Sequence, residues 1–221
     1  MLFKDRKMAG QYLAAELLNY AHDPDVLVLG LPRGGIPVAF EVARAINAPL
    51  DVIVVRKLGL PEQPELAIGA IASGGVRIIN QQIVREAAVS ENAIARIALQ
   101  EERELERREV EYRDERPFPD VHGKTVILVD DGIATGATMW AAVAALKQRQ
   151  AAKIVIAVPV AASETYQNLT SVVDEIVCLA QPEPFYSVGL WYEEFPQTTD
   201  EEVRQVLNIA TNYDQPLSVG T

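Results

Sequence analysis

The chain contains the stretch Val126-Ile127-Leu128-Val129-Asp130-Asp131-Gly132-Ile133-Ala134-Thr135-Gly136-Ala137-Thr138, in which an apolar run meets two carboxylates and a loop of small residues. The apolar run predicts a buried strand, and the pattern that begins at Thr138 predicts a helix. Ligands of open α/β sheets bind outside the carboxyl ends of the strands. We therefore expect the intervening loop to carry a binding site.

The residue types of this loop suit a phosphate group. Small side chains let successive backbone N–H groups converge on one anion, threonine hydroxyls add donors, and the positive end of a helix lies beneath them. The predicted phosphate-binding residues are Ile133, Ala134, Thr135, Gly136, Ala137 and Thr138. Asp130 and Asp131 have oxygens that accept hydrogen bonds from sugar hydroxyls or hold Mg²⁺. In the alternative, the acids and the turn only cap the next helix, which explains one carboxylate and one threonine.

The composition is that of a folded globular chain. Its 221 residues are 49% hydrophobic and 23% charged, which predicts a single domain over residues 1–221 and excludes disorder as a global description. The net charge of −11 argues against nucleic-acid binding. No P-loop or dinucleotide-binding motif follows a strand, so nucleotide triphosphatase and dinucleotide sites are not predicted.

The chain carries no feature that predicts export or membrane insertion. The start of the sequence lacks the apolar core of a signal peptide, and the longest apolar stretch, 154–162, is too short for a membrane span. Cys178 is the single cysteine, which suits a reducing compartment, and we expect it to be a small buried strand residue. The predicted location is cytoplasmic.

Apolar runs alternate with helical patterns along the chain, which predicts an α/β fold with a mainly parallel twisted sheet flanked by helices. The predicted strands are Val26–Leu29, Asp51–Val55, Thr125–Val129, Lys153–Val158 and Ile176–Leu179. The predicted helices are Arg6–Tyr20, a segment marked by Val38, Val42 and Ile46, Thr138–Arg149, Ser163–Leu169 and Thr199–Ile209.

Two segments are expected to stand apart from this sheet. Ala67–Ala72 and Val76–Ile79 flank two glycines and predict a hairpin. The segment 80–116 is predicted to be a helical insertion, continuous from Gln81 to Arg116, with a charged second half that is either solvated or faces a partner. Its length and its apolar first half suggest a homodimer. Residues 181–221 are expected to form a small hood and a C-terminal cap.

Basic residues follow the first two predicted strands. In Leu31-Pro32-Arg33-Gly34-Gly35 the glycines allow close backbone approach and Arg33 supplies a forked cationic donor, although a simple strand-to-helix turn explains the same residues. Arg56 and Lys57 end the second strand, and a polar, proline-bearing stretch continues to Glu65. The alternative for that stretch is a solvated connection.

The segment 126–138 resembles the ribose-phosphate signature of type I phosphoribosyltransferases, and the order of elements resembles an uncharacterised bacterial branch of that family. The resemblance implies that Asp130 and Asp131 contact the ribose hydroxyls of phosphoribosyl pyrophosphate and that the loop after Gly132 holds its 5-phosphate. It implies further that Pro32, Arg33, Gly34 and Gly35 belong to a pyrophosphate loop, and that Arg56 and Lys57 begin a flexible catalytic loop.

The segment 184–193 is similar to the hood with which purine-salvage members of the family hold the base. The resemblance implies that Tyr186, Ser187 and Trp191 contact a flat heterocycle and that Glu193 adds a ligand to a metal-bound pyrophosphate. A local aromatic cluster that seals the end of the sheet is the alternative. The family's acid in the phosphate loop is replaced by Ala134, and its lysine after the strand at 153–158 is absent, which argues against 6-oxopurine salvage.

The reaction implied by the resemblance is Mg²⁺-dependent transfer of ribose-5-phosphate to a nitrogenous base or amine, with release of pyrophosphate. Its catalytic residues would be Arg33, Lys57, Asp130 and Asp131, and its metal ligands Asp130, Asp131 and Glu193. Two other functions remain open. One is a non-catalytic sensor of phosphoribosyl pyrophosphate or a nucleotide, and the other is a hydrolase in which water replaces the base.

Overall fold

The computed structural model describes residues 2–60, 63–114 and 116–213, and its centre is a five-stranded parallel sheet. The strand order is β2-β1-β6-β7-β8, and every neighbouring pair is parallel. The strands are β1 (Val26–Gly30), β2 (Leu50–Val52), β6 (Thr125–Val129), β7 (Lys153–Val160) and β8 (Glu175–Ala180). This arrangement confirms the predicted mainly parallel α/β fold.

Both faces of the sheet are buried, because alternate residues of the central strands enter different cores. On β1, Val26 and Val28 belong to one apolar cluster, while Leu27 and Leu29 belong to the other. β6 alternates in the same way. Such strands contain continuous apolar runs rather than alternating ones, which is why they could be predicted from the sequence.

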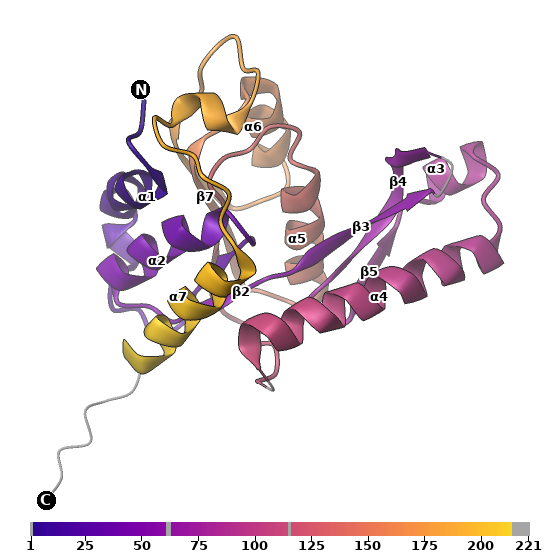
Figure 1. The fold of residues 1–221 in the computed structure, drawn as a ribbon, viewed down its shortest axis with the longest axis horizontal. Helices are drawn as coiled ribbons and strands as arrows, with labels where there is room; N and C mark the ends of the chain where they lie inside the picture. Colours follow the sequence, from indigo (N-terminus) through magenta and orange to yellow (C-terminus); the bar gives the residue numbers. More distant parts are fainter. Residues whose placement is uncertain (1, 61–62, 115, 214–221) are drawn as a thin grey trace, which may run out of the picture.

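Helices cover the two faces of the sheet (Figure 1). The first layer contains α1 (Arg6–Ala15), α2 (Gly35–Ile46) and α7 (Asp200–Tyr213). The second contains α5 (Ala137–Gln148) and α6 (Ser163–Thr170). Between β8 and α7 the chain is irregular apart from the 3₁₀ helix η2 (Val188–Trp191), and this segment lies above one end of the sheet in Figure 1.

An arm protrudes to the right of the central sheet in Figure 1. It consists of a three-stranded antiparallel sheet packed against a long helix. Its elements are β3 (Val55–Leu60), β4 (Gln63–Ala72), β5 (Val76–Ile79), α3 (Gln81–Glu86) and α4 (Glu91–Arg113). The hairpin predicted around residues 73–75 is therefore confirmed as β4 and β5.

The stretch after Arg56, expected to be a flexible loop or a solvated connection, contains two strands, and its catalytic role stays a prediction. Most of the described residues there belong to β3 and β4, and residues 61–62 lie outside the described part of the chain. Leu58 is fully buried and packs in the same cluster as Ile94 and Ile97 of α4. The strand is thus held by a helix that follows it by more than 30 residues, which its polar local sequence did not indicate.

The continuous helix predicted from Gln81 to Arg116 is wrong, because two helices with separate N-caps fill the segment. The Asn80 side chain accepts hydrogen bonds at the start of α3, and the Ser90 side chain accepts one from the Ala93 amide at the start of α4. Between them, Ala88 adopts a left-handed φ of 49°. The predicted ion pairs Glu104–Arg108 and Glu109–Arg113 both form, each at 2.9 Å.

Smaller differences concern the ends of elements. α1 stops at Ala15 and is followed by the 3₁₀ helix η1 (Leu18–Tyr20), so the predicted helix over Arg6–Tyr20 is too long. Tyr12 and Leu18 are exposed, whereas Leu13 is fully buried. The second strand ends at Val52 rather than Val55, because Val55 already pairs with Ala72 in the arm.

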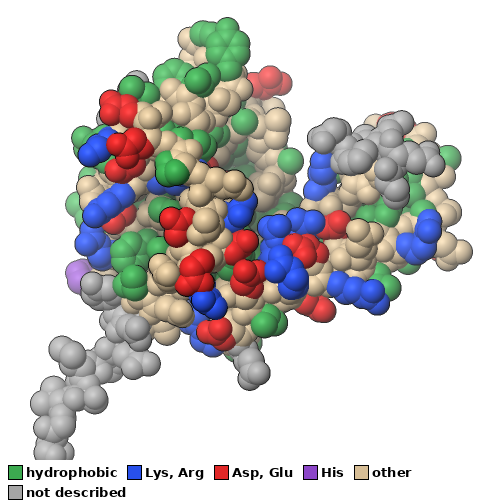
Figure 2. Space-filling model, in the orientation of Figure 1, with side chains coloured by type: hydrophobic (Ala, Val, Ile, Leu, Met, Phe, Trp, Pro, Cys, Tyr) green, Lys and Arg blue, Asp and Glu red, His purple; other side chains and the backbone are tan. Residues whose placement is uncertain are grey.

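Figure 2 shows basic and acidic side chains interspersed along α4, as expected for a charged outer face. Among the residues that the structure describes, no helix is both long enough and apolar enough to cross a membrane.

Candidate functional site

The loops after β1 and β6 leave the sheet side by side. The strands are neighbours, but the chain proceeds from β1 to β2 on one side and from β6 to β7 on the other. Such a reversal opens a crevice at the carboxyl edge of a parallel sheet. The Leu31 amide donates to the Val129 carbonyl at 2.8 Å, which joins the two loops where they begin.

The two loops touch so closely that glycine is required at the contact. A Cβ on Gly34 would lie 2.0 Å from Asp131 Oδ2, and one on Gly35 would lie 2.8 Å from the Asp130 Cα. Gly34 has an ordinary helical φ of −63°, so close approach rather than backbone conformation excludes a side chain there. The structure therefore brings together the two motifs singled out in the sequence. It also shows a cis peptide bond between Pro32 and Arg33.

The loop from Ile133 to Thr138 is fixed at its start and at its end. Ile133 forms an isolated parallel bridge with Ala161 beyond β7, and the Thr165 hydroxyl of α6 donates to the Ala134 carbonyl at 2.6 Å. Gly136 adopts a left-handed φ of 73° immediately before α5 begins. The loop is thus held on its inner side and open on its outer side.

The outer side of this loop carries donors without partners. Within residues 2–60, 63–114 and 116–213, no acceptor lies within hydrogen-bond distance of the amides of residues 134–138. The Thr135 and Thr138 side chains are exposed and likewise make no hydrogen bond in that part of the chain. Free amides at the N-terminus of a helix are donors of the kind that bind anions, so the predicted phosphate-binding role of this loop stays a prediction.

Asp130 and Asp131 lie between this loop and Gly34. Burial raises the pKa of Asp130 well above its ordinary value, and the neighbouring charge of Asp131 raises it further. Burial also raises the pKa of Asp131, although Arg6 opposes that shift. Asp130 Oδ1 accepts a hydrogen bond from the Asp131 amide at 2.8 Å. A ligand that donates hydrogen bonds or brings positive charge would relieve the cost of these buried carboxylates.

Arg6 of α1 holds Asp131, and sequence analysis missed this residue. Arg6 Nε lies 2.8 Å from Asp131 Oδ2, and the guanidinium carbon lies 3.8 Å from the centre of the Phe195 ring. The Tyr192 hydroxyl donates to the Asp131 carbonyl at 2.6 Å. These contacts join α1, the hood segment and the loop after β6. In the sequence, only the density of aromatic residues after Gln181 pointed to a role for Tyr192 and Phe195 near the site.

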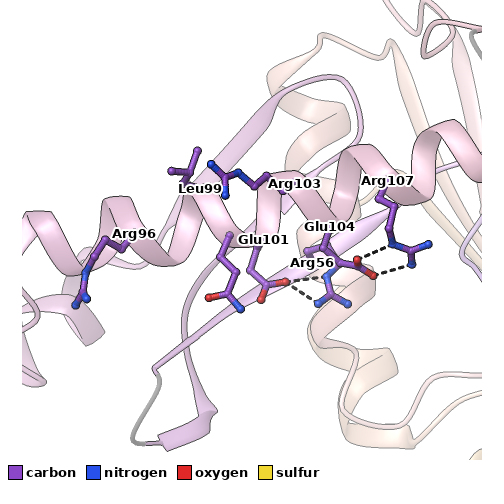
Figure 3. A pocket seen from close by; sticks show the side chains of 8 residues that line it. Arg56, Arg96, Leu99, Glu101, Arg103, Glu104 and Arg107 are labelled. Carbon is purple, nitrogen blue, oxygen red and sulfur yellow. Dashed lines mark hydrogen bonds and ion pairs between the residues drawn. The ribbon is translucent and has the colours of Figure 1, made fainter.

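The two arginines predicted to bind the ligand are both paired with carboxylates. Arg33 Nη1 lies 3.7 Å from an oxygen of Asp200, at the start of α7. Arg56 Nη2 lies 2.6 Å from Glu101 on α4 (Figure 3). Lys57 is exposed on β3, directly opposite Ala70 of β4.

The predicted base-binding residues are spread along the hood segment. Tyr186 is 77% exposed, and Ser187 is exposed as well. Trp191 is half-buried, and its Nε1 is buried without a hydrogen-bond partner in the described part of the chain. A Cβ on Gly132 would lie 2.6 Å from Val188, so the segment packs directly on the loop after Asp131. Apolar residues of the hood, Tyr192 among them, form the expected aromatic cluster with Phe3.

The predicted set of three metal ligands does not form. Among residues 2–60, 63–114 and 116–213, no three His, Cys, Asp or Glu side chains are grouped as metal ligands. Glu193 is exposed, and its amide donates to the Phe3 carbonyl at 2.8 Å; its role as a ligand to a metal-bound pyrophosphate stays a prediction. Two adjacent carboxylates remain, which suits Mg²⁺ that takes its other ligands from a phosphorylated substrate and water.

Comparison with known proteins agrees with this geometry. Residues 3–186 match the profile of the family described as phosphoribosyl transferase domain. The chain belongs to the phosphoribosyl transferase family. A Mycobacterium tuberculosis relative, MT0597, which its name places provisionally among the phosphoribosyl transferases, is 46% identical over 209 residues, covering 95% of this chain. This phosphoribosyl transferase chain spans about half the length of that relative, 47%.

Solved structures support the same fold for this phosphoribosyl transferase. TT1426 from Thermus thermophilus is 41% identical and superposes with a TM-score of 0.83, covering 94% of this chain and 98% of that one. AQ2163 from Aquifex aeolicus is only 14% identical, with a TM-score of 0.52 over 91% of this chain and 85% of that one, and shows likeness of fold alone. The chain thus has the type I phosphoribosyltransferase fold.

Cys178 is not among the predicted site residues. It lies half-buried on β8, and burial raises the pKa of its thiol to about 11. The thiol therefore stays protonated at neutral pH and is a poor nucleophile, in agreement with its interpretation as a small strand residue.

Proposed function

We propose that the chain transfers ribose-5-phosphate from phosphoribosyl pyrophosphate to a nitrogenous base or amine and releases pyrophosphate. The observation that supports this proposal is the contact between the loops after β1 and β6, in which Gly34 and Gly35, next to Arg33 in the chain, pack against the two carboxylates that precede the partner-free amides. A sugar that bears one phosphate and one pyrophosphate needs these three kinds of group together.

The loop from Ile133 to Thr138 would hold the 5-phosphate. Its amides and the Thr135 and Thr138 hydroxyls supply neutral donors, and the N-terminus of α5 adds a positive potential. This matters for a chain with a net charge of −11, which has to bind a polyanion through local donors rather than through its overall charge. The carboxylates of Asp130 and Asp131 would accept hydrogen bonds from the ribose 2- and 3-hydroxyls.

Asp130 and Asp131 are also the residues that would hold Mg²⁺. Bound Mg²⁺ neutralises charge on the pyrophosphate leaving group. Asp130 fits this role, because its buried carboxylate has a raised pKa that a nearby cation would lower. Asp131 would keep one oxygen on Arg6 and offer the other.

Departure of pyrophosphate leaves positive charge on the sugar and negative charge on the leaving group. Arg33, together with Arg56 and Lys57 at the start of the arm, would stabilise the leaving group electrostatically. The loops would fix the sugar between the acceptor and the pyrophosphate, which removes much of the entropic cost of the reaction.

The acceptor would enter beside the hood. Tyr186 offers an exposed ring for stacking on a flat heterocycle, with Ser187 and Trp191 nearby in the sequence. Because no acidic side chain lies at Ala134, the loop offers no carboxylate there for a proton on the base. We therefore propose a nitrogenous acceptor other than a 6-oxopurine.

The test is incubation of the full chain with Mg²⁺, radiolabelled phosphoribosyl pyrophosphate and a panel of bases and amines. A nucleotide or phosphoribosylamine product supports the transferase. Ribose phosphate without such a product would indicate the hydrolase, and saturable binding without consumption would indicate the sensor. The double variant Asp130→Asn and Asp131→Asn should lose turnover and sugar binding. Unchanged binding of Mg²⁺ and phosphoribosyl pyrophosphate by that variant would contradict the assigned roles.

We also propose that the chain works in the cytoplasm, where its substrate is a soluble metabolite and Cys178 stays reduced. Fractionation of cells that express a tagged full-length protein tests this location. Recovery of the tagged protein in a membrane or secreted fraction would contradict it.

A further inference from the structure

Both arginines of the proposed pyrophosphate site are held by carboxylates from outside the two ligand loops. Asp200 belongs to α7 near the C-terminus, and Glu101 lies in the middle of α4 in the arm. Arg33 and Asp200 are each about one-third exposed, whereas Glu101 is 19% and Arg56 28% exposed. A phosphoryl oxygen and a carboxylate compete for the same donors of a guanidinium, so pyrophosphate that bound at these donors would displace Asp200 and Glu101.

The carboxylates are fixed more firmly than the arginines. Asp200 accepts a hydrogen bond from the hydroxyl of Tyr112, which is fully buried on α4. Glu101 lies on the packed side of α4, between the buried residues Ile97 and Leu105. The long arginine side chains therefore make the movement, and the carboxylates set the positions from which they start.

We propose that Glu101 and Asp200 are positioning residues that compete with pyrophosphate for Arg56 and Arg33. The inference rests on the proposed function, because it assigns both arginines to the pyrophosphate group. In the ligand-free chain the two pairs hold the arginines out of the space that pyrophosphate would occupy, and they lower its affinity. Removal of either carboxylate without change of shape should therefore tighten binding.

The surroundings allow each carboxylate to lose its arginine at small cost. Glu101 lines an open groove of about 640 Å³ together with Arg96, Arg103 and Arg107, so positive charge remains near it (Figure 3). Asp200 keeps its hydrogen bond from Tyr112 and lies in the first turn of α7, where the helix dipole favours a negative charge. Exchange of partners therefore leaves neither carboxylate isolated.

The experiment compares calorimetric titrations of inorganic pyrophosphate with Mg²⁺ into the full chain and its variants. The test variants are Glu101→Gln and Asp200→Asn. The matched controls are Glu102→Gln, next to Glu101 and unpaired in the described part of the chain, and Glu201→Gln, next to Asp200 and paired only on the surface of α7. Each control removes one negative charge, as the test variants do, but leaves the carboxylates that pair with Arg56 and Arg33 in place.

The dissociation constant should fall about two- to fivefold in each test variant, as expected for loss of a partly exposed ion pair, and change less in the controls. In an Arg33→Gln background, Asp200→Asn should no longer tighten pyrophosphate binding. If Asp200 acted only through the structure, its substitution would still change binding in that background. Glu101→Asp keeps the negative charge, so this variant should bind pyrophosphate more weakly than Glu101→Gln does. Unchanged or weaker binding in both test variants, with wild-type binding intact, would overturn the inference. A wild type that binds neither pyrophosphate nor phosphoribosyl pyrophosphate would instead overturn the proposed function on which it rests.

Discussion

Arg6 and Asp131 lie 125 positions apart in the sequence, yet their side chains meet at 2.8 Å beside the proposed sugar site. The Arg6 guanidinium makes the largest contribution that opposes the upward shift of the Asp131 pKa caused by burial. It is also nearly closed to solvent, with Arg6 10% and Asp131 14% exposed. The protonation state of Asp131, which is proposed to bind the sugar, therefore depends on the N-terminal helix.

Replacement of Arg6 should shift the pH dependence of sugar binding. Arg6→Met removes the guanidinium that lowers the pKa of Asp131, so that pKa should rise and the carboxylate should be protonated at higher pH. Titrations of phosphoribosyl pyrophosphate between pH 5 and pH 9 should then show the loss of affinity on acidification at a higher pH than in the wild type. Lys7→Met, at the neighbouring position, should keep the wild-type midpoint. An unshifted midpoint in Arg6→Met would contradict this role.

Asp130→Asn should stabilise the folded chain at neutral pH. The folded-state pKa of Asp130 lies above its ordinary value of 3.8, so stability is lost as pH rises from that value through the folded pKa. Asparagine carries no charge, and its carbonyl oxygen keeps the hydrogen bond from the Asp131 amide. We expect a gain of about 1–3 kcal/mol at pH 8, the order of the cost of an uncompensated buried polar group. Urea unfolding at pH 8 and pH 4 measures the difference in the free energy of unfolding between Asp130→Asn and the wild type. A difference as large at pH 4 as at pH 8 would refute the assignment of this cost to the buried charge.

Gly34→Ala should destabilise the chain through a clash with Asp131. A new Cβ would lie 2.0 Å from Asp131 Oδ2, and overpacking of this kind costs about 1–3 kcal/mol. The cost should be smaller in an Asp131→Ala background, where the clashing oxygen is absent. A thermal or urea unfolding cycle of the four proteins measures the coupling between the two positions. Additive effects would show that the two loops do not meet as described.

Loss of the Thr135 and Thr138 hydroxyls should weaken phosphate binding without unfolding the chain. Thr135→Val and Thr138→Val each remove a donor that has no partner in the described structure. We expect a loss of about 0.5–1.5 kcal/mol each in binding of ribose-5-phosphate by calorimetry. Thr170→Val on α6, whose hydroxyl bonds only to its own helix, is the control. Equal losses of affinity for ribose-5-phosphate in all three variants would contradict phosphate binding by this loop.

Self-association through α4 remains a prediction. Leu99 and Val110 are 51% and 60% exposed on the outer side of this helix. Sedimentation at micromolar concentration should show a dimer, and the double variant Leu99→Glu and Val110→Glu should shift it toward monomer. Exposed Ile209→Glu on α7 is the matched control. Sedimentation of the wild type as a monomer at this concentration would contradict the prediction.

The central sheet and its ligand loops could be predicted because their signals are local. A buried parallel strand is a continuous apolar run, and Asp130 and Thr138 are placed by the strand and helix on either side of them. The glycines at 34 and 35 signalled close approach of the backbone, but their contact with Asp131 and Asp130 was found only in the structure.

The arm and the ion pairs could not be predicted, because they depend on contacts between distant segments. β3 includes Arg56, Lys57 and Gly59, which did not signal a strand, and it is held by its pairing with β4 and by the burial of Leu58 in the cluster that includes α4. Likewise, no spacing in the sequence links Arg6 to Asp131 or Arg33 to Asp200. The broken helix at Ala88 is a different case, because its capping residues Asn80 and Ser90 are local signals that an almost uninterrupted helical pattern obscured.

The shielded thiol on β8 makes the chain a convenient background for site-specific labelling. With a pKa of about 11, Cys178 should react slowly with maleimides at neutral pH. A cysteine introduced at an open position, such as Tyr186→Cys on the hood, would then take up a fluorophore almost alone. A second dye on the outer side of α4 would report by energy transfer whether the hood and the arm approach each other when substrate arrives.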